Sequence, residues 1–212
     1  MATTTTNATE ELPAINEILA SVGQAPVTTL DQTNPDVSIA YNTLLNVSRE
    51  VQAEGWTFNK EYDVKVLPDN DDFILIANNV LQAKLNQDTH RGTSVVIRRD
   101  PTDTKKKLYN RTADPSTYEF TDEDYRLDYV YYFDWVDLPT PIQDYIVARA
   151  AAIVSSRIVG DSTQFQLLQQ REAFARAMAL EYECNQGNYT YFGHEQGRNN
   201  YVSYQPYKAL ER

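Results

Sequence analysis

The sequence predicts an α+β protein, in which a helical bundle carries an inserted antiparallel β-sheet domain and an extended C-terminal tail. Three observations predict this class. Apolar residues recur at steps of three and four near both ends of the chain, as on one face of an α-helix. Between about residues 63 and 136 the period changes to two, as in a strand with one buried face. Residues 186–212 show neither period.

The first expected helix, Leu12 to Val27, has one apolar face. Thr9 is its expected N-cap, and Gly23 can take the left-handed conformation that ends a helix, before Pro26 prevents the helix from resuming. Residues 1–9 are expected to form a flexible leader, because this segment lacks the basic and apolar regions of a signal peptide. The apolar face consists of Leu12, Ile15, Ile18, Leu19 and Val22.

The second expected helix runs from about Asn34 to Glu54. Asn34-Pro35-Asp36 supplies a cap, a proline in the first turn and an acidic residue near the positive end of the helix dipole. Gly55 ends the helix, and the aromatic residues of Trp56-Thr57-Phe58 are placed to cover that end.

The middle of the chain predicts strands separated by turns rich in Asp, Asn and Pro. The last expected strand places aromatic and apolar residues from Tyr125 to Trp135 on one face and a mixed polar set on the other. This pattern favours an antiparallel sheet that is buried on one side. The expected strands are Val64–Leu67, Phe73–Ile76, Val80–Leu85, Ser94–Arg99, Leu108–Asn110 and Arg126–Val136.

Two further helices are expected after the strands. Thr140-Pro141-Ile142-Gln143 has the sequence of a capping box, and Gly160 ends the helix that follows it. Asp161-Ser162-Thr163-Gln164 starts the next helix by the same logic, and that helix continues to Gly187.

Charge and cysteine content exclude several classes of protein. The net charge of -11 argues against a sequence-reading nucleic-acid binder, which needs a basic surface to displace counterions. Residues 186–212 differ, with three basic and two acidic side chains. Cys184 is the one cysteine, which excludes an internal disulfide and fits a reducing compartment. With no run long enough to span a bilayer, we expect a soluble protein with no membrane contact.

A search for catalytic or metal-binding residues yields only weak candidates, so no enzyme, metal or cofactor is predicted. His90 and His194 lie in neither metal-ligand nor triad spacing with Cys184. Asp69-Asn70-Asp71-Asp72 has the oxygen density of a calcium loop but lacks its glycine and bidentate glutamate, which favours a solvated turn. Asp122-Glu123-Asp124 is interpreted as solvated charge rather than a general acid or base, and no glycine motif supports nucleotide binding.

Several short blocks follow one another along the chain. Glu11-Leu12 and the segment Ile18 to Val27 come first, then Gly55-Trp56-Thr57-Phe58-Asn59. Leu67-Pro68-Asp69, Lys107-Leu108-Tyr109-Asn110-Arg111 and Leu180-Glu181-Tyr182-Glu183 follow, before a tyrosine-rich tail. In order and spacing these blocks resemble the tail tubular protein A family of short-tailed phages. These are the adaptor, or gatekeeper, proteins of the podovirus tail.

The resemblance implies a structural protein of the virion tail, at the head–tail junction and synthesised in the host cytoplasm. Members form a ring of twelve subunits that joins the portal protein to the tail nozzle, tail tubular protein B, and offers a docking site for tail fibres. A ring of this type uses head-to-tail contacts. Its lumen would line the DNA ejection channel, where acidic side chains repel phosphate, so that DNA passes without specific binding.

In this interpretation, residues 10–60 and 139–185 form the bundle of the ring, 61–138 form the inserted β-rich domain, and 186–212 form the tail. Tyrosine offers a large contact area at low entropic cost, so we expect the tail aromatics to bind the portal. This set is Tyr189, Tyr191, Phe192, Tyr201, Tyr204 and Tyr207. A basic cluster at a hairpin tip is a solvated surface by default, and as a sharper hypothesis it faces the nozzle and fibres. This cluster is Arg98, Arg99, Lys105, Lys106 and Lys107.

Three alternatives stay open. A head-completion or connector protein of another tailed-phage type is also helical and ring-forming, but it would need neither the large sheet nor the aromatic strand. A tail-associated hydrolase would use a carboxylate pair within residues 61–138. A surface carbohydrate-binding module is suggested only by exposed aromatics.

Overall fold

The computed structural model describes residues 8–86, 92–101, 104–121 and 125–187. Over these residues the chain forms four α-helices and antiparallel sheets of three and two strands, which confirms the α+β class. The helices are α1 (Ala8–Ser21), α2 (Pro35–Ala53), α3 (Thr140–Ile158) and α4 (Ser162–Gly187), and a 3-10 helix, η1, spans Trp135–Asp137. The strands are β1 (Lys60–Val66), β2 (Val80–Leu85), β3 (Val95–Arg99), β4 (Lys106–Asn110) and β5 (Tyr125–Tyr131).

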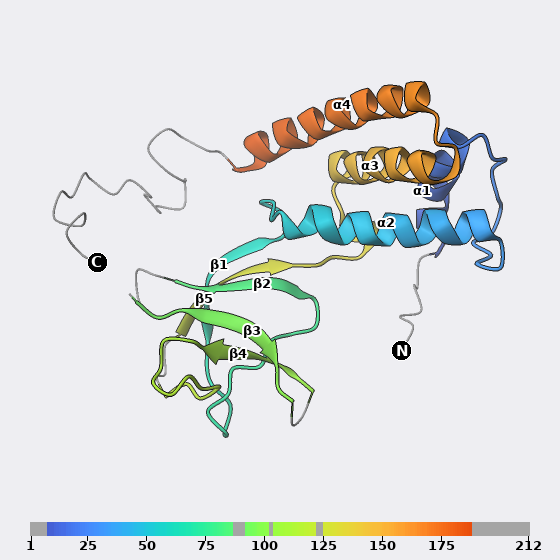
Figure 1. Ribbon diagram of the computed structural model, residues 1–212. Helices are drawn as coiled ribbons and strands as arrows, with labels where there is room; N and C mark the ends of the chain where they lie inside the picture. Colours follow the sequence, from blue (N-terminus) through green and yellow to red (C-terminus); the bar gives the residue numbers. More distant parts are fainter. Residues whose placement is uncertain (1–7, 87–91, 102–103, 122–124, 188–212) are drawn as a thin grey trace.

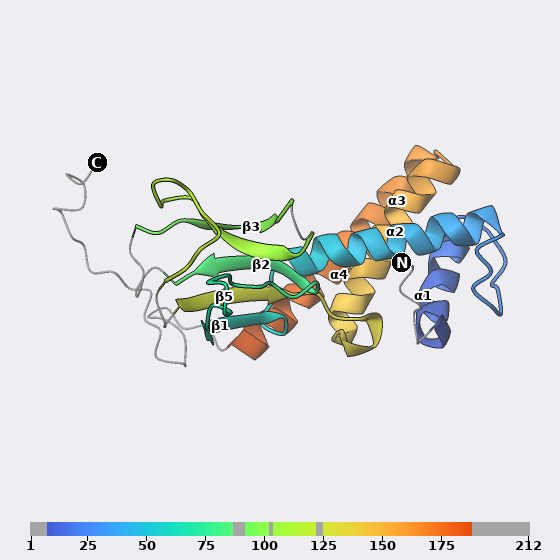
Figure 2. The same ribbon diagram turned by 90° about the horizontal axis from the view of Figure 1, so that it is seen from below.

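The helices lie together on one side of the molecule and the strands on the other (Figure 1). The view from below shows the same division, with α2 extending from the helical side toward the sheets (Figure 2). Each group of elements has its own buried core, one built from α1 to α4 and one built from the strands. The exact division into domains stays a prediction.

The expected start of α2 and the stop signals of α1 and α2 are confirmed, whereas Thr9, the expected N-cap of the first helix, already lies inside α1. Asn34 Oδ1 accepts a hydrogen bond from the Asp36 N–H at 3.0 Å and caps α2. Gly23 and Gly55, which follow α1 and α2, both have φ of +76°, the left-handed conformation that glycine adopts without strain.

The capping box expected at Thr140 is wrong. Thr140 is already helical, and Pro139 occupies the N-cap position without a side-chain cap. The Gln143 side chain, which a capping box would turn back to the cap, instead donates to the Trp135 carbonyl at 2.7 Å. At α4 the expected start is confirmed in part. Asp161 Oδ1 accepts from the Thr163 N–H at 2.9 Å, but Gln164 donates to the carbonyl of Ser21 in α1.

Helix α3 is the centre of the helical group and contacts α1, α2 and α4. Its inward residues, among them Ile142, Tyr145 and Ile146, are fully buried, and small alanines between them allow close approach of the neighbouring helices. Helix α4 runs along α3 (Figure 1). The described part of the chain contains no helix long and apolar enough to cross a membrane.

Strand β5 is the middle strand of the larger sheet, with β1 and β2 antiparallel on either side. Leu127 at its centre is fully buried and lies opposite Val64 on β1 and Leu85 on β2. The hairpin β3–β4 forms a separate two-stranded sheet. The expected alternation of buried and half-exposed residues along β5 is confirmed from Tyr125 to Tyr129.

Three expected strands differ most from the structure. Phe73–Ile76 makes only isolated bridges, at Phe73 and Leu75. The expected strand to Val136 ends at Tyr131, because the backbone of Phe133 pairs with a side chain of α2 and residues 135–137 form η1. Strand β1 starts four residues earlier than expected, since a bulge with Asp63 at φ of 61° interrupts its period of two.

Candidate functional site

The described residues that stand out as a candidate functional site form the junction between the helices and the larger sheet. We define the junction as residues 52–59 together with Tyr131 and Phe133. Here the end of α2 meets the start of β1 and the end of β5. The local sequence dictates the turn, because Gly55 can leave the helix with positive φ and the next four residues all find partners.

Gln52 ties α2 to the chain that leaves β5. Its side-chain Nε2 donates to the Phe133 carbonyl at 3.1 Å, and its Oε1 accepts from the Phe133 N–H at 2.8 Å. Nε2 also donates to Ser48 Oγ at 3.0 Å. Gln52 is fully buried, and these bonds satisfy its amide and both backbone groups of Phe133. A buried side chain therefore takes the place of a strand partner at Phe133.

Asn59 makes the matching connection from the other end of the turn. Its Nδ2 donates to the Gln52 carbonyl at 2.8 Å and to the Tyr131 carbonyl at 2.9 Å. Its Oδ1 accepts from the Trp56 N–H at 2.7 Å, which closes the turn on itself. Asn59 is 1% exposed, so the low surrounding dielectric strengthens these bonds.

Trp56 fixes the turn in the helical core. Its indole Nε1 donates to the Val51 carbonyl at 2.7 Å, a carbonyl near the end of α2 that also accepts from the Glu54 backbone N–H. Its ring meets Tyr145 of α3 edge to face, with 6.5 Å between the ring centroids. Phe58 packs on Phe133 with the two rings tilted by 45° and their centroids 6.2 Å apart. The aromatic residues after Gly55 thus cover the helix end as the sequence predicts.

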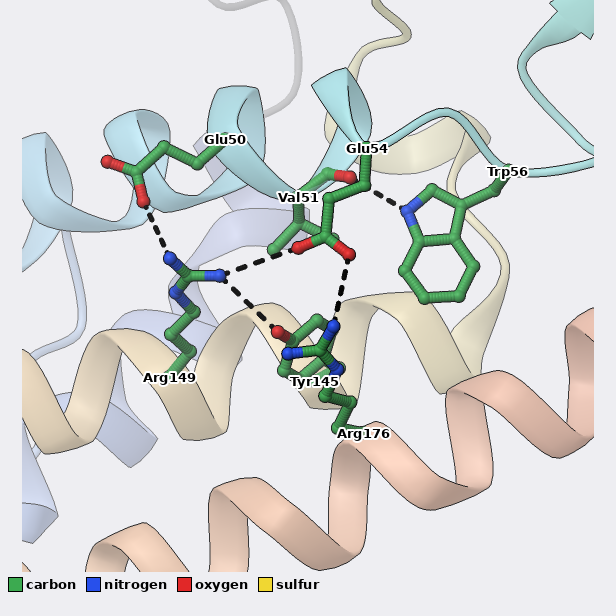
Figure 3. Close-up of polar contacts among 7 residues, drawn as sticks. All are labelled: Glu50, Val51, Glu54, Trp56, Tyr145, Arg149 and Arg176. Carbon is green, nitrogen blue, oxygen red and sulfur yellow. Dashed lines mark hydrogen bonds and ion pairs between the residues drawn. The ribbon is translucent and has the colours of Figure 1, made fainter.

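Charged residues connect three helices beside the junction (Figure 3). Arg149 of α3 lies 3.0 Å from the Glu50 carboxylate and 3.6 Å from Glu54, both at the end of α2. Arg176 of α4 approaches Glu54 at 3.7 Å and lies over the Tyr145 ring. Because these pairs are partly exposed, they orient the helices more than they stabilise them.

The last turns of α4 are attached to the same turn. The Glu183 carboxylate accepts from the Thr57 backbone N–H at 2.8 Å and from the Thr57 hydroxyl at 2.7 Å. Glu183 belongs to the last block that supports the family resemblance, and Thr57 belongs to the block Gly55–Asn59. Two blocks that are far apart in the sequence therefore meet at the junction.

The junction is suited to a mechanical role. Its polar side chains bond to backbone groups, so they are occupied in holding the chain in place. In the described residues, no group of three or more His, Cys, Asp and Glu side chains could hold a metal ion. The arrangement fixes the angle between the helices and the sheet.

The aromatic side of β5 continues this arrangement into the sheet. Tyr129 is 6% exposed, and burial raises the pKa of its hydroxyl to about 12, with a smaller contribution from Tyr131. The rings of Tyr129, Tyr131 and Phe133 contact one another in sequence along the strand and past its end. The aromatic residues that the sequence places on one strand face are therefore divided between the two cores, since Phe133 and Trp135 pack on the helical core.

The five residues of the basic cluster do not form one exposed patch. Lys107 is buried, lies 2.7 Å from the Asp100 carboxylate and stacks over the Phe73 ring. The Arg98 guanidinium lies 4.1 Å from the centroid of the Tyr109 ring. Lys106 is half-buried and donates to the Asn78 carbonyl at 3.0 Å. A contact made by this cluster would thus use Arg98, Arg99 and Lys105, which are exposed.

The other candidates from the sequence lie apart from the junction. Asp69 Oδ1 accepts from the Asp71 and Phe73 N–H groups at 3.0 and 2.8 Å, as in a turn closed by its own side chain. Cys184 is exposed on α4. The remaining candidates lie outside the described residues: His90, Asp122, Glu123, Asp124, Tyr189, Tyr191, Phe192, His194, Tyr201, Tyr204 and Tyr207.

Sequence reasoning missed Gln52 and, except as part of a block, Asn59. The available signal for Gln52 is its position, since it follows Ser48 by one turn and Val51 by one residue on the inward side of α2. A long polar side chain at such a position needs a buried partner.

Comparison with known protein families identifies the family of this chain. The model of a family described as Tail tubular protein matches residues 12–189. The chain belongs to the tail tubular protein family. The match extends from α1 to the end of α4 and includes both sheets, so the junction lies inside the matched region. This member of the family is a structural protein of a phage tail and a component of the virion tail. No curated protein matches the chain.

Proposed function

We propose that this tail tubular protein is the adaptor of a short phage tail. In this proposal it forms a dodecameric ring at the head–tail junction that joins the portal to the tail nozzle. The ring offers a docking site for tail fibres and lines the channel through which DNA is ejected. The observation that carries the proposal is the family match over both the helices and the sheets.

Two features of the chain support a load-transmitting ring subunit. The junction joins helices and sheet through buried hydrogen bonds, so force applied to one part reaches the other without a flexible linker. The net charge of -11 suits a channel wall that repels the phosphates of passing DNA. We infer no catalytic role. An infectivity assay with Asp122, Glu123 and Asp124 changed to amides tests this point, and the expected infectivity is unchanged.

The contacts with partners are part of the same proposal. The aromatic residues of 186–212 would bind the portal, and the exposed members of the basic cluster would face the nozzle and fibres through charge complementarity. Deleting residues 186–212 should abolish portal binding while the subunit stays soluble and folded. Normal head attachment after this deletion would contradict the assignment of the tail.

The decisive experiment is a mass measurement of the purified full chain, alone and mixed with the portal protein. We expect an assembly of about twelve subunits of 24.2 kDa each, either alone or on the portal. A chain that stays monomeric in both conditions would overturn the adaptor proposal.

The runner-up function is a head-completion or connector protein of another tailed-phage type. Such a protein needs no large sheet, whereas this chain has two antiparallel sheets and a core of their own. Their presence favours the adaptor.

A further inference from the structure

A hollow of about 240 Å³ lies between α2 and α3, which run side by side in the helical part of the chain (Figure 1). Polar and charged side chains make up most of its lining. On the α2 side these are Thr43, Asn46, Arg49 and Glu50, and on the α3 side Arg157 follows Ile153 by one turn. A hollow with this lining suits a polar or charged group rather than an apolar one.

Two arginines bring unused hydrogen-bond donors to the hollow. Arg157 donates to the Thr43 hydroxyl at 3.3 Å, which occupies one of the five N–H donors of its guanidinium. Arg49 is exposed on the α2 side. Among the described residues, neither Arg49 nor Arg157 has an ion-pair partner. Both guanidinium groups are therefore available to an anion, whose oxygens such a planar group can bind in pairs.

Glu50 is the acidic residue of the lining, but it pairs with a different cation. Its carboxylate lies 3.0 Å from Arg149 of α3, which also approaches Glu54 at 3.6 Å (Figure 3). Glu50 therefore does not serve as the partner of Arg49 or Arg157. Because its negative charge stays beside the hollow, an anion of single charge is favoured there over a doubly charged phosphate.

The rest of the lining fits a carboxylate that is carried on a side chain. Asn46 is exposed, and its amide can donate a further hydrogen bond to the carboxylate oxygens. Half-buried Ile153 offers apolar contact to the methylene groups of an Asp or Glu side chain. Inorganic phosphate has no such groups, so a carboxylate of a protein uses more of the hollow.

We propose that Arg49 and Arg157 bind the carboxylate of an acidic side chain from a second copy of this chain. The sequence carries 30 acidic residues against 19 basic ones, so each copy offers its neighbour many carboxylates and few cations. A contact between the hollow of one copy and an acid elsewhere on the next is head-to-tail, as a closed ring requires. The inference rests on the proposed ring and names a contact within it.

Cross-linking of the full chain tests this contact. Arg157→Lys keeps the positive charge and puts an amine into the hollow, and a carbodiimide joins an amine to a carboxylate that is in contact with it. Assemblies are formed from equal amounts of isotope-labelled and unlabelled copies, alone and with the portal protein. We expect mass spectrometry to find the amine at position 157 linked to an Asp or Glu peptide of the other isotope.

The matched control for this experiment is Arg111→Lys. Arg111 is exposed beside β4, and an amine there should form no link between copies. Equal linking between copies from positions 111 and 157 would overturn the inference. A link from position 157 that stays within one copy, above all to Glu50, would overturn it as well, because the hollow would then be closed by its own chain.

A second measurement removes the two charges. Arg49→Gln and Arg157→Gln in one chain should weaken self-association about tenfold or more, since charged hydrogen bonds across an interface are lost. Arg111→Gln removes an exposed arginine outside the hollow and should leave self-association unchanged. Circular dichroism should show the same helix content in all variants. Sedimentation of each variant measures the association.

Other results separate this inference from the adaptor proposal. If the chain with both glutamines forms rings of normal mass, the contact is wrong and the adaptor function stands. If the amine at position 157 links only to the portal protein, or if the loss of both arginines lowers only the binding of DNA, the second copy is the wrong occupant. If the unmodified chain never assembles, with or without portal, both proposals fail.

Discussion

The Glu183 carboxylate accepts hydrogen bonds from both the hydroxyl and the backbone N–H of Thr57, at 2.7 and 2.8 Å. The two residues are 126 positions apart in the sequence. Their contact attaches the last turns of α4 to the turn that leads from α2 into β1. The end of α4 is therefore fixed relative to the turn that leads into the sheet.

Glu183→Gln should destabilise the protein by about 1–2 kcal/mol, because it replaces charge-assisted hydrogen bonds by weaker neutral ones. Urea unfolding of the full chain measures the change. Glu181→Gln is the matched control, since Glu181 is exposed on the same helix two residues away, and its stability should be unchanged. Equal stability of both variants would show that the Thr57 contact does not hold α4.

Gly55→Ala should cost more stability than Gly23→Ala, although both glycines have φ of +76°. The shared backbone strain is about 1–2 kcal/mol. At Gly23 an added Cβ meets nothing within 4 Å, whereas at Gly55 it would lie 2.5 Å from Lys60 Cε and 3.3 Å from Val130 Cγ2. The Lys60 side chain can move, so the difference reports mainly the contact with Val130 in β5. Denaturation midpoints of the two variants test the order, and the reverse order would contradict the geometry of the turn.

Gln52→Met should destabilise the protein by about 2–4 kcal/mol. The substitution keeps the size of the side chain but leaves the part-buried N–H and carbonyl of Phe133 without their partner. Gln82→Met is the comparison, because Gln82 also donates to a backbone carbonyl, that of Ala53, but from an exposed position. Its cost should stay below about 1 kcal/mol. Similar losses for both variants, measured by urea unfolding, would argue against the role given to the buried amide.

The sequence predicts the helices better than the junction, for a physical reason. Helix α2 is specified by neighbours in sequence, because Asn34 and Gly55 at its ends act within a few residues. The end of β5 is different. The alternation from Tyr125 to Trp135 continues past Tyr131, yet the strand stops where Gln52 replaces the neighbouring strand at Phe133. No local sequence pattern indicates that Gln52 is the partner of Phe133.

The start of β1 shows the same limitation. The bulge at Asp63 hides the strand that starts at Lys60. The Asp63 side chain accepts from Arg126 on β5 and from Asn86, which directly follows β2. The role of Lys107 is likewise set from a distance, since its charge is buried against Asp100 and the Phe73 ring. The sequence shows that a side chain such as that of Lys107 is charged, but whether it is exposed depends on contacts that form only in the fold.

Glu11→Gln should raise stability at pH 7. Glu11 is 4% exposed, and its Oε2 has no hydrogen-bond partner among the described residues. Burial raises the pKa of this carboxyl above 4.5, the nearby Asp134 charge raises it further, and a hydrogen bond from Tyr41 lowers it in part. The folded protein therefore binds the Glu11 proton more tightly than the unfolded chain does. This contribution to stability is fully present below pH 4.5 and is lost as pH rises through the raised pKa.

The glutamine variant lacks this loss, so it should be more stable than the unmodified chain at pH 7. The advantage should disappear near pH 4, where Glu11 is neutral in both states. Urea unfolding of both proteins at the two pH values measures the difference in their free energies of unfolding. The contributions of the other carboxylates are the same in both proteins and cancel in this difference. Glu17→Gln on the same helix removes an exposed pair with Arg171 and should instead lower stability, by less than about 1 kcal/mol. A glutamine variant at position 11 that is less stable at pH 7 would show that the ionised carboxylate has a favourable partner.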